Sequence, residues 1–120
     1  MINRLTPILP VADVALELAF YMSLGFEVHI DSVEEYPPDE FAAVRHGEYV
    51  LFGLARTSPG TRPNEVGLVW QFETSDLDEI ARLAHTAGLD VVAPVVTQTW
   101  GRRTMTLRSP NGYEVGFEDA

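Results

Sequence analysis

Along this chain the hydrophobic residues recur with either a strand-like or a helix-like spacing. The same order of strand-like and helix-like segments occurs twice. Apolar residues at every second position indicate β-strands, and apolar residues three or four positions apart indicate helices. In the first half these periods predict a strand over 4–11, a helix over 14–24, a strand over 26–31, an acidic loop over 32–40, and a hairpin of strands over 41–46 and 48–55. The helix has Asp13 as its expected N-cap and Gly25 at its expected end, with Leu16, Phe20 and Leu24 on its apolar side.

The second half repeats this order of elements. The same periods predict a strand over 66–73, a helix that Ser75 caps and Gly88 ends, a strand over 90–96, and a final hairpin that turns at Pro110-Asn111-Gly112. Asp76 follows Asp13 by 63 residues, which is also the spacing between the two helix-ending glycines. The chain is therefore expected to be α+β, a single domain of two units, about 1–58 and 63–120, which share a core or a sheet and are joined by a polar linker over 56–65.

The last predicted strand has one apolar face and one face that carries two carboxylates and a glycine. Its members are Tyr113, Val115 and Phe117 on the first face and Glu114, Gly116 and Glu118 on the second. Along a strand Glu114 and Glu118 are roughly 13 Å apart, which is too far for shared acid–base chemistry but suits contact with a cationic ligand. Solvation at a sheet edge accounts for these two carboxylates equally well.

The composition limits the classes of function. The absence of cysteine excludes disulfides, thiolate nucleophiles and cysteine–metal sites. The formal net charge of −10 argues against nucleic acid as a partner and is compatible with a cationic small ligand, or simply with a solvated acidic surface. No apolar run is long enough to span a membrane, and residues 1–4 lack the apolar region of a signal peptide, so a cytoplasmic location is expected.

Several short motifs together resemble one family. They are Leu9-Pro10-Val11-Ala12-Asp13, Phe20-Tyr21, Leu24-Gly25-Phe26, Trp100-Gly101-Arg102 and Pro110-Asn111-Gly112. In order and spacing they resemble the vicinal oxygen chelate superfamily, which includes glyoxalase I, extradiol dioxygenases, and fosfomycin- and bleomycin-resistance proteins; the likeness is greatest to the bleomycin-resistance branch. The resemblance implies two βαβββ modules whose curved mixed sheets surround a cavity, with the helices outside, in a homodimer. Ser109 stands where the family usually has Asp, and this difference is expected to alter the hydrogen bonds of the last turn.

Enzymes of this superfamily bind one divalent metal ion through His, Gln or Glu side chains on inward strands, so the matching positions can be checked. They are occupied here by Thr6 or Pro7, Phe52, Val69 or Trp70, and Gly116. A slip of one residue in the first hairpin brings Leu51 or Gly53 to the Phe52 position, and neither is a better ligand. The resemblance therefore implies that the usual metal site is missing, so no catalytic residue is assigned and no cofactor is expected.

Aromatic and charged residues are the candidates for contact with a ligand. They are Trp70, Trp100, Phe52, Glu114, Glu118 and Arg102. Flat rings stack on planar heterocycles and attract cations, although core filling explains Trp70 and Phe52 as well. Arg102 either pairs with the acidic surface of its own chain or reaches Glu114 across a dimer.

Three functions remain open. The first is metal-independent binding of a planar, cationic small molecule in an aromatic and acidic cleft, with antibiotic sequestration as its sharpest form. The second is a metal-dependent lyase, isomerase or dioxygenase with displaced ligands, for which His29, Glu114 and Glu118 are the candidates. The third is a structural dimer without a ligand, whose cavity Trp70 and Phe52 fill.

Overall fold

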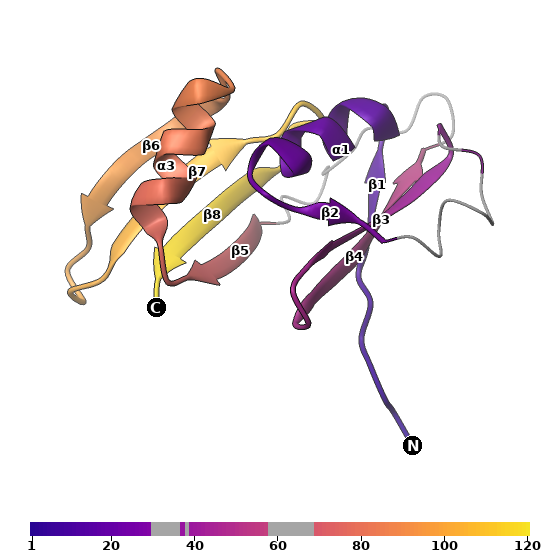
Figure 1. Cartoon of the computed structure of the whole chain (residues 1–120), viewed down its shortest axis with the longest axis horizontal. Coiled ribbons are helices and arrows are strands. Elements are labelled where there is room, and N and C mark those ends of the chain that lie inside the picture. Colours follow the sequence, from indigo (N-terminus) through magenta and orange to yellow (C-terminus); the bar gives the residue numbers. More distant parts are fainter. Residues whose placement is uncertain (30–36, 38, 58–68) are drawn as a thin grey trace. The chain divides into compact units, whose positions relative to one another are not determined.

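The chain consists of two compact units, Met1–Pro63 and Asn64–Ala120 (Figure 1). The computed structural model describes residues 1–29, 37, 39–57 and 69–120. The predicted acidic loop and the predicted linker lie for the most part outside the described residues, as do the last residues of the strand predicted over 26–31. Neither described helix is long and apolar enough to cross a membrane.

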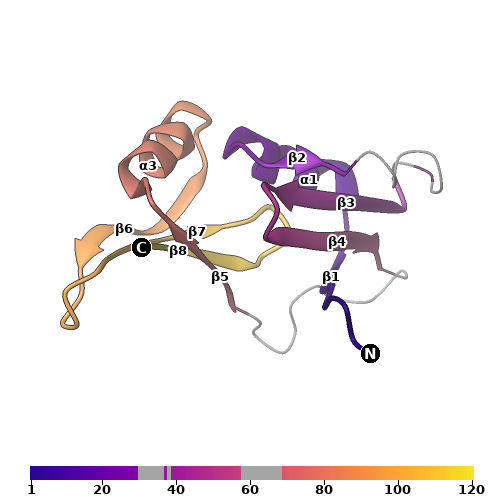
Figure 2. The same ribbon diagram turned by 60° about the horizontal axis from the view of Figure 1, so that its bottom comes forward.

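The first unit is a four-stranded sheet with one helix packed on it. Its elements are β1 (Ile8–Val11), α1 (Val14–Ser23), β2 (Glu27–Val28), β3 (Phe41–His46) and β4 (Val50–Arg56). The strand order is β1-β4-β3-β2, in which β1 runs parallel to β4 and the other neighbours are antiparallel (Figure 2). β1 is therefore an edge strand, a place in a sheet that tolerates Pro10, and it begins at Ile8 rather than at Arg4.

α1 begins after Asp13 as predicted, and the Asp13 carboxylate accepts a hydrogen bond from the backbone N–H of Leu16 at 3.0 Å. The prediction that Leu16 faces the core is wrong, because its side chain is 52% exposed. The buried side of the helix is made of Val14, Glu17, Phe20 and Tyr21. Because Phe20 and Tyr21 both point inward, the buried face is centred between them, and Leu16 falls at its edge.

Tyr21 is the centre of the core of the first unit. Its ring meets Phe20, Phe26 and Phe52 edge to face, with centroid distances of 5.1, 5.4 and 4.9 Å. Aromatic pairs of this geometry contribute about 0.5–1.5 kcal/mol each beyond their buried area. The cluster fixes α1 to β4.

The second unit repeats this topology. Its elements are β5 (Val69–Thr74), α3 (Leu77–Thr86), β6 (Asp90–Thr97), β7 (Arg103–Arg108) and β8 (Glu114–Asp119). The strand order is β5-β8-β7-β6, with β5 parallel to β8 and the other pairs antiparallel. The predicted α+β fold of two βαβββ modules is therefore confirmed.

The start of α3 differs from the prediction by one residue. Asp76, not Ser75, is the N-cap, since its carboxylate accepts a hydrogen bond from the Glu79 backbone N–H at 3.1 Å. The Thr74 hydroxyl accepts a hydrogen bond from the Asp76 N–H at 3.1 Å, which closes the turn between β5 and the helix around Asp76. Asp76 is thus the counterpart of Asp13, as the 63-residue spacing indicates.

The internal repeat extends to the register of the strands. Ile8 lies opposite Gly53 in the β1–β4 pair, and Gln71 lies opposite Gly116 in the β5–β8 pair. Ile8 and Gln71 are 63 residues apart, and so are Gly53 and Gly116. The counterpart of Gly116 in the first unit is therefore Gly53, which corrects the assignment of that position to Phe52.

Candidate functional site

The sheet of the second unit has one face covered by α3 and one open face. On β8, Tyr113, Val115 and Phe117 are buried, as the alternation predicted. Residues that lie directly opposite each other on paired strands share a face. By this rule the open face contains Val69, Gln71, Glu73, Thr104, Thr106, Arg108, Glu114, Gly116 and Glu118.

Glu118 is the centre of the most connected group on this face. One of its carboxylate oxygens accepts a hydrogen bond from the Trp100 indole N–H at 2.9 Å, and the other accepts one from the Gln71 amide at 3.1 Å. We call these three residues the Trp100–Glu118 surface. Both donors are neutral, and no arginine in the described part of the chain forms an ion pair with Glu118. Since each carboxylate oxygen can accept more than one hydrogen bond, Glu118 can still accept hydrogen bonds from a cationic group.

The position of Trp100 follows from the turn that joins β6 to β7. The Gln98 N–H donates to the Arg102 carbonyl at 2.8 Å, and the Gly101 N–H donates to the Gln98 carbonyl at 3.0 Å. Gly101 has a φ of 92°, a conformation that favours glycine. The Gln98 side chain also donates to the Thr104 hydroxyl at 2.8 Å. This turn holds the Trp100 ring in place while leaving it 63% exposed.

The Gln71 side chain lies beside Gly116 and reaches Glu118. A Cβ at Gly116 would lie 3.8 Å from the nearest atoms of Gln71, which is an ordinary contact distance. The matching position in the first unit differs, because a Cβ at Gly53 would lie 2.9 Å from the Phe41 ring. The two units therefore offer different chemistry at equivalent places: an apolar ring covers Gly53, and a polar amide borders Gly116.

The remaining charged residues of this face form ion pairs. Arg108 lies 3.8 Å from Glu114 and 3.7 Å from Asp90. Arg102 lies 3.5 Å from Glu73, so within this chain it pairs with the acidic surface and not with Glu114. These pairs are exposed and individually weak, and they leave Glu118 as the carboxylate of this face without a cationic partner among the described residues.

Arg103 anchors the edge of the sheet and does not contribute to the Trp100–Glu118 surface. Its guanidinium donates to Asp119 at 2.7 Å and to Asp78 of α3 at 3.0 Å. Hydrogen bonds to Asp78 and Asp119 raise the pKa of the Arg103 guanidinium, which therefore stays charged at any physiological pH. This contact fastens the start of α3 to β7 and β8.

Two of the aromatic candidates lie on the helix-packed sides of their sheets, Phe52 fully buried and Trp70 half-buried. Phe52 is fully buried against Tyr21. Trp70 lies opposite Val115, on the face of the sheet that α3 covers, and meets Phe72 edge to face at 6.0 Å. The open face instead receives Gln71, which the sequence reasoning missed. Within the second unit the structure thus brings together Trp100, Glu118 and Gln71, with Arg102 in the supporting turn, and places Trp70 on the other face of the sheet.

The residues at the positions where the superfamily binds metal do not fit a divalent ion. The positions that the resemblance indicates are occupied by Thr6 or Pro7, Gly53, Val69 or Trp70, and Gly116, and the strand register places Ile8 and Gln71 opposite the two glycines. None of these residues supplies an imidazole or a carboxylate, and the Gln71 amide is engaged with Glu118. In the described part of the chain, no group of three or more His, Asp or Glu residues is placed to hold a metal ion.

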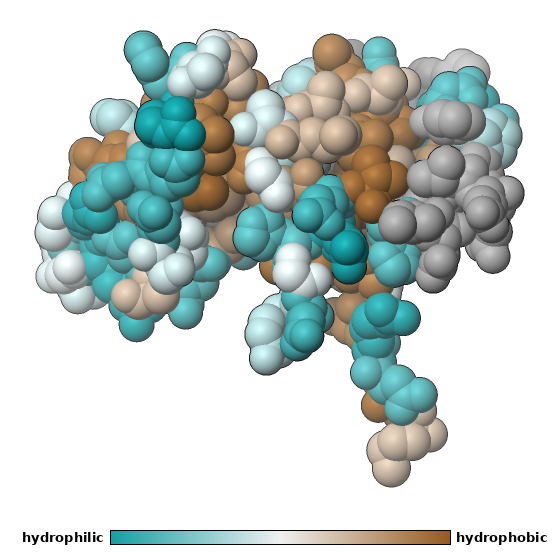
Figure 3. Space-filling model, in the orientation of Figure 1, coloured by the Kyte–Doolittle hydropathy of each residue, from teal (hydrophilic) through white to brown (hydrophobic). Residues whose placement is uncertain are grey.

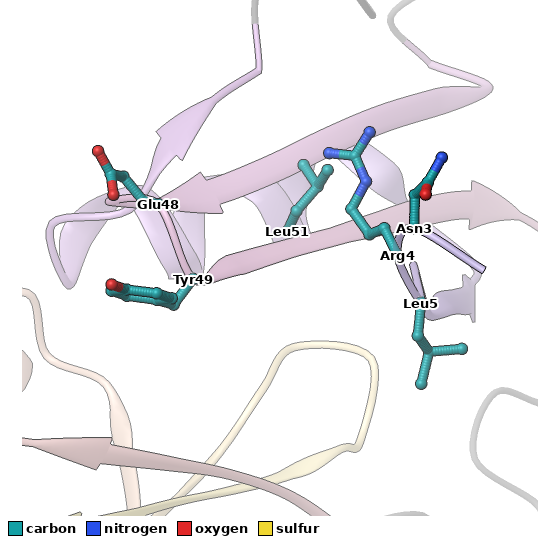
Figure 4. Close-up of a pocket in the computed structure, with 6 residues that line it drawn as sticks. All are labelled: Asn3, Arg4, Leu5, Glu48, Tyr49 and Leu51. Carbon is teal, nitrogen blue, oxygen red and sulfur yellow. The ribbon is translucent and has the colours of Figure 1, made fainter. Parts of the chain in front are cut away.

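A separate hollow of about 510 Å³ lies in the first unit, between the N-terminal segment and the turn from β3 to β4. It is lined by Asn3, Arg4, Leu5, Glu48, Tyr49 and Leu51 (Figure 4). Figure 4 shows that these side chains do not converge: Leu5 points away from Leu51, and Tyr49 lies apart from both. Because Leu5 and Tyr49 are 85% and 96% exposed, this hollow is a weaker candidate than the Trp100–Glu118 surface.

Comparison with known proteins agrees with this architecture. The Glyoxalase/Bleomycin resistance protein/Dioxygenase superfamily matches residues 2–117. A bleomycin resistance determinant encoded on the transposon Tn5 has a similar structure, with a TM-score of 0.74 and 21% identity over 98% of each chain. A bleomycin-binding protein complexed with bleomycin gives a TM-score of 0.71 and 21% identity over 99% of each chain. A glyoxalase/bleomycin resistance protein from Catenulispora acidiphila gives 0.72 and 26% identity, also over 99% of each chain. No curated protein matches the sequence significantly.

Proposed function

Because this chain belongs to the Glyoxalase/Bleomycin resistance protein/Dioxygenase superfamily, we propose that it binds a planar, cationic small molecule on the Trp100–Glu118 surface, without a metal ion and without catalysis. The observation that carries the proposal is the Glu118 carboxylate, which neutral donors hold beside an exposed indole ring. Sequestration of an antibiotic is the sharpest form of this function.

The two side chains of this surface recognise complementary properties of one ligand. Trp100 offers a flat face on which an aromatic ring can stack, and stacked pairs contribute about 0.5–1.5 kcal/mol beyond the buried area. Glu118 offers a negative charge within reach of the same ligand, and the indole face adds attraction for a cation. A molecule that is both planar and positively charged gains from both contacts.

The acidic character of the whole chain supports the same ligand class. A net charge of −10 raises the local concentration of cations and speeds their encounter with the protein. One structural relative is described as a bleomycin-binding protein in complex with bleomycin, which supports small-molecule binding by this fold. The absence of an imidazole or a carboxylate at Thr6, Pro7, Gly53 and Gly116 supports binding without metal.

Isothermal titration calorimetry with proflavine, a planar cation, tests this function. We expect saturable binding to the wild-type protein, weaker by about tenfold in Trp100→Ala and in Glu118→Gln, which corresponds to about 1.4 kcal/mol. The matched control is Glu114→Gln, since Glu114 already pairs with Arg108 and should leave the affinity nearly unchanged. Metal-free bleomycin is the second probe, and fluorescein, a planar anion, should not bind.

One result of these titrations would contradict the proposed binding surface, and a different result would contradict ligand binding as the function. Proflavine affinity that is equal in the wild type, Trp100→Ala and Glu118→Gln would contradict this surface as the site. Failure of both proflavine and bleomycin to bind the wild type would contradict the function itself and favour a structural dimer without a ligand.

A further inference from the structure

The turn between β7 and β8 contains the one Asn-Gly pair of the chain, Asn111-Gly112. The Gly112 N–H donates a hydrogen bond to the Ser109 carbonyl at 2.9 Å, which closes a β-turn. The Ser109 N–H donates to the Tyr113 carbonyl at 2.8 Å, and the Tyr113 N–H donates to the Ser109 hydroxyl at 3.1 Å. Gly112 has a φ of 89°, a conformation that favours glycine. The backbone nitrogen of Gly112 is thus held in place by the turn.

An asparagine that precedes a glycine is chemically reactive, because no side chain on the glycine blocks the approach of its backbone nitrogen to the asparagine side chain. In this reaction the Gly112 nitrogen attacks Cγ of Asn111 and a C–N bond forms. The side-chain nitrogen leaves as ammonia and takes the proton that the backbone nitrogen gives up. Water then opens the succinimide ring at either of its carbonyls, which yields aspartate or isoaspartate. The net reaction is the hydrolysis of an amide, and water is its only other reactant.

We propose that Asn111 is a site of spontaneous deamidation and that the hydrogen bonds of its turn set the rate. Ring closure requires the Gly112 nitrogen to lose its hydrogen and to face the Asn111 side chain, so the bond to the Ser109 carbonyl must break first. Ser109 and Tyr113 are both buried, which anchors the two ends of the turn. The reaction therefore proceeds from a locally open turn, which is a minor population in the folded protein.

The first unit shows that the module does not require this pair. The turn between β3 and β4 occupies the equivalent place, and the residues that precede Asn111 and Gly112 by 63 positions are Glu48 and Tyr49. In that turn Gly47, with a φ of 60°, adopts the left-handed conformation, and it follows a histidine. A glycine therefore serves each turn, but only the second unit places an asparagine before it.

Deamidation would change the turn in two ways. It adds one negative charge to a chain whose net charge is already −10, and the isoaspartate form adds one carbon to the main chain. The length of a turn fixes the register of its strands, and here the register places Arg108 opposite Glu114. A longer turn cannot keep both this register and the hydrogen bonds of Ser109, so the modified protein should be less stable.

This inference concerns the second unit by itself. It does not depend on the proposed ligand site, because Glu118 lies toward the other end of β8 from the turn.

Peptide mapping by mass spectrometry measures the reaction directly. The wild-type protein is incubated at mildly alkaline pH, folded and in urea, and the deamidated fraction of Asn111 is followed with time. Because the open turn is a minor population, we expect the folded protein to react roughly tenfold more slowly than the unfolded chain. Asn3 and Asn64, which precede arginine and glutamate, should react more slowly than Asn111 in urea. No reaction at Asn111 in urea, or equal rates in the two states, would overturn the proposal.

Ser109→Ala tests whether the turn controls the rate. The substitution removes the side-chain acceptor of the Tyr113 N–H and so favours the open turn. We expect Asn111 to react about fivefold faster in the folded variant, which corresponds to about 1 kcal/mol in the opening equilibrium. A rate equal to that of the wild type would overturn control by these hydrogen bonds.

Asp76→Ala is the matched control, because it also removes one acceptor of a backbone N–H but at the other end of the sheet. β5 and β8 are paired so that Val69 lies opposite Glu114, near the turn, whereas Thr74 lies opposite Asp119. In Figure 3 hydrophilic residues, coloured teal, cover much of the position of α3, and the substitution leaves them in place. The deamidation rate should not change. Equal acceleration in Asp76→Ala and Ser109→Ala would show that the whole protein must unfold, and would overturn local control.

Anion exchange separates the deamidated form after incubation, because this form has one more negative charge. We expect its urea midpoint to be lower than that of the unmodified protein, and an equal midpoint would overturn the effect on the turn. Asn111→Gln keeps an amide but would have to form a larger ring, so it should give almost none of the acidic form. An acidic form that persists in Asn111→Gln would overturn the assignment to Asn111. Circular dichroism before incubation confirms that each variant is folded.

Discussion

Ser109 shows how a single side chain completes the turn between β7 and β8. It is 3% exposed, and its hydroxyl accepts a hydrogen bond from the Tyr113 backbone N–H at 3.1 Å. Its own N–H donates to the Tyr113 carbonyl at 2.8 Å, and its carbonyl accepts from the Gly112 N–H at 2.9 Å. The hydroxyl therefore serves as a local acceptor where the family usually places an Asp carboxylate, without adding a charge to a buried position.

Replacing Ser109 with Ala should destabilise the protein measurably. The Tyr113 N–H would lose its side-chain acceptor in a buried place, so we expect the free energy of unfolding to fall by about 1–2 kcal/mol. Urea denaturation followed by circular dichroism measures this change. Ser75→Ala is the control, since Ser75 is exposed and is not the helix cap, and it should leave stability almost unchanged. Equal urea midpoints for the two variants would show that the Ser109 hydroxyl is dispensable.

At the scale of single residues, the sequence predicted part of the candidate site. Glu118 and Trp100 could be found because strand alternation and the loop before the last hairpin identify them. Gln71 was missed because the counting of superfamily positions led to Trp70 or Val69. Alternation in β5 could have identified Gln71, since Trp70 and Phe72 lie on the helix-covered face of the sheet and the residue between them lies on the other face.

At the scale of elements, two substitutions at the start of α3 can test whether Asp76 or Ser75 caps the helix. Asp76→Ala removes the acceptor of the Glu79 N–H, so the free energy of unfolding should fall by about 1 kcal/mol. Ser75→Ala should cause little change. Urea midpoints of the two variants, with helix content checked by circular dichroism, decide between them. A larger loss in Ser75→Ala than in Asp76→Ala would restore Ser75 as the helix cap, as the sequence predicted.

The elements themselves could be predicted because each has a clear period and clear ends, whereas the rotation of α1 could not. The spacing of Leu16, Phe20 and Leu24 is compatible with a buried face, but the neighbouring ring of Tyr21 shifts that face by a fraction of a turn. Glu17 then lies inside and Leu16 at the surface. A carboxylate on the buried side of a helix runs against the usual partition of polar residues, so hydrophobic patterning alone could not find it.

At the scale of the whole molecule, the internal repeat could be predicted because a 63-residue spacing relates caps, helix ends and strands in both halves. The repeat also shows what has diverged. The two sheets keep a glycine at the same register position, but Phe41 covers Gly53 while Gln71 lies beside Gly116. The two helices keep their caps, but the Asn111-Gly112 pair has no counterpart in the first unit. The fold is therefore duplicated, and the features that we propose for function and for modification belong to the second unit.

The same repeat gives the last prediction, which concerns metal ions. The positions that the resemblance assigns to a metal ion hold Thr6 or Pro7, Gly53, Val69 or Trp70, and Gly116. Neither these residues nor Ile8 and Gln71, which lie opposite the two glycines, supply an imidazole or a carboxylate. After incubation with Mn, Fe, Ni or Zn ions and gel filtration, we therefore expect no stoichiometric metal by elemental analysis. Proflavine affinity should be the same with and without EDTA. A retained ion at one equivalent per chain would contradict metal-free binding, and its loss in Glu118→Gln but not in Glu114→Gln would place it on the Trp100–Glu118 surface. In that case the carboxylate that we assign to a cationic ligand would be a metal ligand, and lyase, isomerase or dioxygenase chemistry would become the leading function.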